Sequence, residues 1–89
     1  MTILMKIIDP KRYNLSPRLN LQQNELNELF IIVDRKSRII MKDGHRILKM
    51  VNRIQSIEKD RHVSVLTSAP VCRKTRTFLS NNAVLVKDL

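Results

Sequence analysis

HRILKMVNRIQSIE, residues 45–58, is the most regular stretch of this sequence. Its apolar side chains recur every three or four residues, which places Ile47, Val51 and Ile54 on one face of a helix. Basic side chains occupy the opposite face. The spacing therefore predicts an amphipathic helix over residues 45–58, and the rest of the fold is built outward from it.

Downstream of this helix the pattern alternates between strand and helix. Val63–Thr67 is short and rich in β-branched residues, which predicts a strand. Ser68 is placed to cap a second helix that runs to about residue 80, with Pro70 in its first turn. Residues 83–86 then predict a last strand. Strands joined by a crossover helix are parallel, so we expect a parallel pairing here.

Upstream, residues 2–8 predict a strand because they are aliphatic and are stopped by Asp9-Pro10. Residues 10–19 hold two prolines and predict a connection. Asn20 and the glutamates that follow it predict a helix over residues 21–30.

Residues 30–43 are ambiguous in the sequence. One interpretation continues the preceding helix in phase to a stop at Asp43-Gly44, as one long helix. The other is a hairpin of residues 30–33 and 38–41, which the isoleucine and valine content favours. The unbroken phase favours the helix slightly. Together these elements predict a small single α/β domain over residues 1–89, with a mostly parallel sheet of about three strands and three helices packed on it.

Charge is the unusual property of the composition. The 89 residues carry 17 basic and 8 acidic side chains, a net charge of +9 with a pI near 10.5. A field of this sign favours polyanions such as nucleic acid, an anionic membrane or an acidic protein. No run approaches the roughly 20 apolar residues of a membrane span, no signal peptide is recognisable, and Cys72 is the single cysteine. We therefore expect a cytoplasmic protein without membrane partners.

Nine of the basic residues fall within residues 35–62, and seven of them form the candidate binding cluster. Arginine and lysine suit phosphate oxygens and give affinity without base specificity. The chain has only three aromatic residues, which disfavours binding by base stacking. We predict a basic module, not an enzyme, that contacts nucleic acid through phosphates, RNA ahead of DNA. The predicted nucleic-acid-binding residues are Arg35, Lys36, Arg38, Lys42, Arg46, Lys49 and Arg53.

A second hypothesis rests on the uneven distribution of charge. Residues 20–34 hold three acidic and no basic side chains, while the chain after them is basic. An acidic helix beside a basic one suggests a non-catalytic adaptor subunit that docks on an acidic partner or on a second copy of itself.

The remaining motifs are weak. Ser68 and Arg73 flank the start of the second helix and form a candidate anion site. Cys72 in the first turn of that helix is expected to have a lowered pKa, and we interpret it as a structural thiol. His45 and His62 lack companion ligands. The sequence predicts no metal, no cofactor and no catalytic residue.

Overall fold

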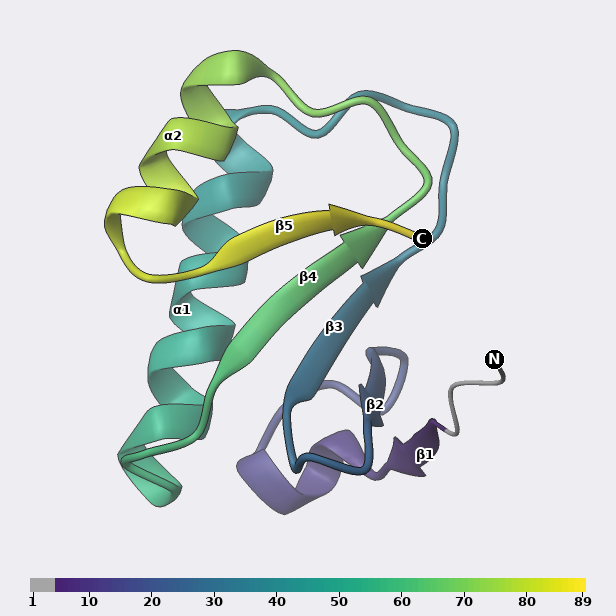
Figure 1. The fold of residues 1–89 in the computed structure, drawn as a ribbon, viewed down its shortest axis with the longest axis vertical. Helices are drawn as coiled ribbons and strands as arrows, with labels where there is room; N and C mark the ends of the chain where they lie inside the picture. The colour runs from purple at the N-terminus through teal and green to yellow at the C-terminus, as the bar shows by residue number, and fades with distance from the viewer. Residues whose placement is uncertain (1–4) are drawn as a thin grey trace.

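The computed structural model describes residues 5–89 (Figure 1). Within them the chain forms five strands, two α-helices and one 3-10 helix. In chain order these are β1 (Lys6–Ile8), η1 (Pro10–Tyr13), β2 (Asn20–Gln23), β3 (Leu29–Val33), α1 (Met41–Ile57), β4 (Val63–Thr67), α2 (Arg73–Asn81) and β5 (Leu85–Asp88). The predicted strand over residues 2–8 is found in part as β1, and its residues 2–4 lie outside the described residues.

All five strands belong to one mixed sheet with the order β1-β2-β3-β4-β5. The first two pairs, β1–β2 and β2–β3, are antiparallel. The last two pairs, β3–β4 and β4–β5, are parallel, and α1 and α2 are their crossover helices. The predicted three-stranded, mostly parallel sheet with three helices is therefore wrong. The parallel pairing downstream of α1 was predicted correctly.

The segment predicted to form a helix over residues 21–30 belongs to a β-hairpin instead. Residues 21–30, predicted to be helical, form β2, a turn and the start of β3. The Asn24 side-chain oxygen accepts hydrogen bonds from the backbone N–H groups of Leu26 (3.0 Å) and Glu28 (2.9 Å). Asn27 adopts a left-handed conformation with φ 63°. Asparagine side chains that bond to nearby backbone groups favour turns over helices, which is why the helical phase is not realised here.

Residues 34–40 form neither the long helix nor the second arm of the expected hairpin. Ile31 lies in the middle of β3, fully buried between β2 and β4. After β3 the chain bends at residues 36–37 and is then held by Ile39, whose N–H donates to the Pro70 carbonyl (2.8 Å) and whose carbonyl accepts from the Cys72 N–H (2.9 Å). This bridge joins the connection before α1 to the connection before α2.

The amphipathic helix is confirmed as α1, which begins four residues earlier than predicted. Ile47, Val51 and Ile54 are buried and pack in one hydrophobic cluster with Ile31 of β3. Gly44 does not stop a helix but lies inside α1, facing α2: a Cβ atom at Gly44 would lie 2.9 Å from Cγ2 of Thr75. Figure 1 shows the two helices packed side by side against the parallel strands.

The second helix also begins at a different residue. Thr67 accepts a hydrogen bond at its Oγ1 from the Ala69 backbone (3.0 Å), where the chain bends at residues 68–69, and Cys72 takes the N-cap position of α2. Ser68 is therefore not the cap. The strand over Val63–Thr67 is confirmed, and β5 begins two residues later than expected. Ala83, with φ 61°, makes the left-handed turn between α2 and β5.

Candidate nucleic-acid interface

The exposed face of α1 carries a row of four basic side chains, here called the basic ridge. Its members are Lys42, Arg46, Lys49 and Arg53, all exposed. Their spacing of four, three and four residues places them next to one another along one side of the helix. The row is about 16 Å long at about 1.5 Å per residue. Asp43 is the one acidic residue within α1. The structure thus brings four of the seven predicted residues together.

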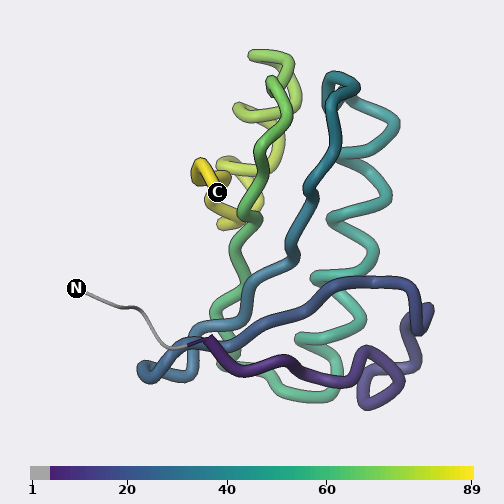
Figure 2. Tube along the Cα trace, turned by 90° about the vertical axis from the view of Figure 1, so that its right-hand side faces the viewer, coloured from purple at the N-terminus to yellow at the C-terminus, as the bar shows by residue number. Residues whose placement is uncertain are grey.

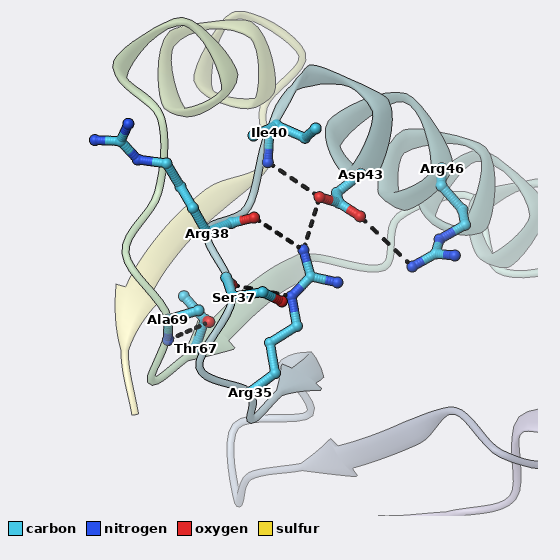
Figure 3. Close-up of polar contacts among 8 residues, drawn as sticks. All are labelled: Arg35, Ser37, Arg38, Ile40, Asp43, Arg46, Thr67 and Ala69. Atoms are coloured by element: carbon cyan, nitrogen blue, oxygen red, sulfur yellow. Dashed lines mark hydrogen bonds and ion pairs between the residues drawn. The ribbon is translucent and has the colours of Figure 1, made fainter.

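The other three predicted residues lie in the connection between β3 and α1. Lys36 and Arg38 are exposed, whereas Arg35 is half-buried and tied to its surroundings. Its Nε donates to the Ser37 carbonyl (3.2 Å), and its Nη2 donates to the Arg38 carbonyl (3.3 Å) and to Oδ2 of Asp43 (2.7 Å). Figure 3 shows this guanidinium enclosed by the connection, with the Arg38 side chain pointing away from it. Arg35 thus shapes the connection.

Asp43 is the residue that organises the start of α1. One oxygen, Oδ2, accepts from the Ile40 backbone N–H (3.0 Å) as well as from Arg35, and Oδ1 lies 3.7 Å from a guanidinium nitrogen of Arg46 (Figure 3). The hydrogen bond from Arg35, followed by that from Ile40, lowers the pKa of the Asp43 carboxyl. An acidic group in the first turn also complements the helix dipole. Sequence reasoning assigned Asp43 to a helix stop and missed this role.

Asp43→Asn is expected to lower the free energy of unfolding by about 1–2 kcal/mol at pH 7, because it weakens the cap and the Arg35 bond. The folded-state pKa lies below the ordinary value of 3.8, so the unfolded chain binds more protons in acid. The stabilisation is therefore complete above pH 3.8 and is lost as pH falls through the folded-state pKa. Urea denaturation from pH 7 to pH 2 measures this, with exposed Asp60→Asn as the control. A constant gap between wild type and Asp43→Asn across that range would contradict it.

The C-terminal half of the ridge lies beside the segment that follows η1. Figure 2 shows η1 next to the last turns of α1. Nη1 of Arg53 donates a hydrogen bond to the Asn14 carbonyl (3.4 Å). A shallow hollow runs here between residues 14–16 and the exposed side of α1, and Arg46, Lys49 and Arg53 line it. The ridge is thus bordered by polar groups as well as by solvent.

None of the three aromatic side chains is available for base stacking. Tyr13 is fully buried, and its hydroxyl donates to Oε2 of Glu58 (2.5 Å). Burial, followed by this bond to a carboxylate, raises the pKa of Tyr13. Phe30 is buried, and Phe78 packs against His45 with their ring centroids 4.6 Å apart. Among the described residues the surface therefore presents cations without an exposed Phe or Tyr ring.

The candidate anion site at Ser68 and Arg73 is not assembled by a helix start. Ser68 lies in the bend that follows β4, while Arg73 is the first residue of α2. The Ser68 hydroxyl donates to Oδ1 of Asp34 (2.5 Å), so a carboxylate already lies at this position. A negative charge there opposes the binding of an anion.

Cys72 is half-buried and stands at the N-cap of α2. The backbone N–H groups of Lys74 and Thr75 lower the pKa of its thiol, more than any neighbouring charge does. The direction agrees with the sequence prediction, but the main cause is the free amide groups of the helix start.

The thiolate absorbance of Cys72 near 240 nm is expected to appear at a lower pH in the folded chain than in the same chain in urea, because unfolding takes the backbone N–H groups of Lys74 and Thr75 away from the thiol. A pH titration of both states measures the two midpoints, with Cys72→Ser as the blank. Coincident midpoints would show that the helix start does not stabilise the thiolate.

Two further properties concern only the residues that the structure describes. No group of three or more His, Cys, Asp or Glu side chains lies close enough to hold a metal ion. No helix is both long and apolar enough to cross a membrane.

Solved structures share this fold. No protein-family model matches the chain, and no curated protein matches it. EndoMS in a complex with dsDNA superposes with a TM-score of 0.71 at 9% identity, over 96% of this chain and 36% of that one. EndoMS in apo form gives 0.68 at 8% identity, over 96% and 36%. A repair endonuclease from Pyrococcus abyssi gives 0.63 at 8% identity, over 79% and 31%. The chain thus spans about a third of the length of these proteins and has the fold of that third.

Proposed function

We propose that this protein is a binding module for nucleic acid and that the basic ridge on α1 contacts the phosphate backbone. The observation that carries the proposal is the exposure of four cations in one row, with the single acid of the helix, Asp43, already paired at its edge. At about 3.4 Å of duplex axis per phosphate of one strand, the row of about 16 Å corresponds to about five phosphates of that strand.

Double-stranded DNA is the first ligand to test. The fold similarity to EndoMS, one of whose structures holds dsDNA, supports this choice. Duplex RNA is the second, because phosphate contacts are common to both polymers. No Phe or Tyr side chain is exposed among residues 5–89, which argues against a preference for single strands. The proposal concerns binding, and we assign no catalytic residue.

The adaptor hypothesis loses its original support in this structure. It assumed an acidic helix over residues 21–30, but Glu25 and Glu28 lie in and beside the β2–β3 turn. Asp34 is held by Ser68 at the end of β3. The acidic residues thus do not form a helical face that docks on α1.

Binding to a labelled 20-base-pair duplex at 50–200 mM salt tests the proposal. Four phosphate contacts predict a slope of log K against log salt of about −3.6, at about −0.9 per contact. Lys49→Ala and Arg53→Ala are each expected to reduce the magnitude of this slope by about 0.9, uniformly across DNA sequences. Lys87→Ala is the matched control, because it removes one exposed charge from β5 at the far edge of the sheet. Absence of binding at 50 mM salt, or a slope near zero, would overturn the proposal.

A further inference from the structure

A cavity of about 300 Å³ opens between α1, the second half of β3 and residues 16–19. Its floor is aliphatic and includes Ile31 and Val33 from β3 and Ile47 from α1. These side chains are held by the sheet pairing and by the helix, so the floor is part of the core of the molecule. The volume is at the lower end of the range for small-molecule sites.

The rim of the cavity is charged and predominantly positive. Arg18, Arg35 and Arg46 line it together with a single acid, Asp43, which gives a net charge of +2. Asp43 accepts two hydrogen bonds from its neighbours, so its charge is already compensated. An occupant of this rim therefore has to be an anion to be favoured by its charge.

Two of the guanidinium groups have the freedom to bind a ligand. The Arg46 side chain is 71% exposed and lies 3.7 Å from Asp43, beyond a normal hydrogen bond. The Arg18 side chain is exposed. Arg35 uses Nε and Nη2 in its bonds within residues 5–89, and those bonds fix its direction. Figure 3 shows Arg46 and Arg35 on either side of the Asp43 carboxylate.

We propose that this cavity binds a small amphiphilic anion: its apolar body lies on the aliphatic floor and its carboxylate or phosphate head contacts Arg18 and Arg46. Arginine is suited to both heads because its planar fork donates two parallel hydrogen bonds. At about 30 Å³ per water molecule the cavity has room for about ten waters. This matches a ligand the size of an eight-carbon acid, and acetate would leave the floor uncovered. The proposal stands independently of nucleic-acid binding, although Arg46 belongs to both sites.

The test titrates the ¹⁵N-labelled full chain with octanoate, octyl phosphate, 1-octanol and acetate, and follows the amide resonances. Octanoate or octyl phosphate is expected to shift the amides of Leu19, Val33 and Ile47 saturably. Octanol, which lacks the charge, is expected to bind about three- to tenfold more weakly than octanoate. Acetate is expected to give no saturable shift. The tighter of the two anions identifies the preferred head group.

Variants separate this site from the basic ridge. Arg18→Ala and Arg46→Ala are each expected to weaken octanoate binding about three- to tenfold. Lys49→Ala and Arg53→Ala, which lie outside the cavity lining, are expected to leave it unchanged while they weaken nucleic-acid binding. Val33→Phe places a ring in the cavity and is expected to abolish octanoate binding if its spectrum remains folded. The proposal is overturned by equal affinity for octanoate and octanol, by no saturable shift with either anion, or by unchanged octanoate binding in both arginine variants.

Discussion

Replacing Lys42, Arg46, Lys49 and Arg53 together by glutamine is expected to lower affinity for duplex DNA at least a hundredfold at 50 mM salt. Four cations that neutralise four phosphates release counterions on binding, and that release is the main driving force of contact with the backbone. For wild type, a slope of about −3.6 means a loss of affinity of about 150-fold between 50 and 200 mM salt. The quadruple variant is expected to show almost no salt dependence.

The variant is suited to this test because its fold should be retained. All four side chains are exposed and point away from the packed face of α1. Glutamine has a helix propensity close to that of lysine and arginine, so α1 should keep its stability. Circular dichroism and urea denaturation check this point. Binding that persists with an unchanged salt slope would move the interface to another basic surface, such as Lys36 and Arg38.

Gly44→Leu is expected to reduce the free energy of unfolding by about 3 kcal/mol or more, the upper range for overpacking a core. Gly44 lies where α1 faces α2, and a Cβ atom there would lie 2.9 Å from Cγ2 of Thr75 and 3.5 Å from Phe78. Thr75 is fully buried within α2, so its displacement would disturb the residues packed around it. A larger side chain has to push the helices apart, which opens the core beneath them. Chemical denaturation measures the change.

The expected mechanism can be checked by a compensating pair. Gly44→Ala gains about 1 kcal/mol of helix propensity but brings its Cβ against the Thr75 methyl group. Thr75→Ser removes that methyl group. The change in the free energy of unfolding caused by Gly44→Ala should therefore be more favourable in the Thr75→Ser background than in wild type. Additive effects of the two substitutions would show that the 2.9 Å approach does not limit packing.

The elements that the sequence predicted well are those whose period agrees with their environment. In α1 the aliphatic stripe and the basic face keep one phase over four turns, because solvent and core lie on opposite sides. Val63 and Val65 are buried in β4, which is paired on both sides, and β-branched side chains suit that position. Both conditions are local, so they are visible in the sequence alone.

The hairpin was missed because its helical pattern was accidental. Leu26, Leu29 and Phe30 recur at helical spacing, yet Leu26 is 78% exposed while the other two are buried in β3. Asn24 favours the turn over the helix, because its side-chain oxygen accepts hydrogen bonds from two backbone N–H groups of the turn. The Arg35–Asp43 pair was also missed. These side chains come together only because of the path that residues 34–40 take from β3 to α1, where Ile39 is bridged to Val71.

The cavity was beyond prediction for a similar reason. Its arginines come from three separate segments, and Arg18 was not among the residues singled out in the sequence. The basic ridge, by contrast, lies on one helix. Three residues of the ridge could be placed from the helical pattern over residues 45–58, and Lys42 joined them because α1 begins at Met41.

The mixed pairing of the sheet has a consequence for how the chain folds. The β2–β3 hairpin joins segments that are close in sequence and needs only its turn to form. The parallel β3–β4 pair matches Ile31 with Val65, so a long loop that contains all of α1 has to close before any of its hydrogen bonds form. We therefore expect the hairpin to form early and closure of the crossover to limit the folding rate. Substitutions at Asn24 should mainly change how often the chain attempts that closure, whereas substitutions in α2 should mainly change how long the native state lasts.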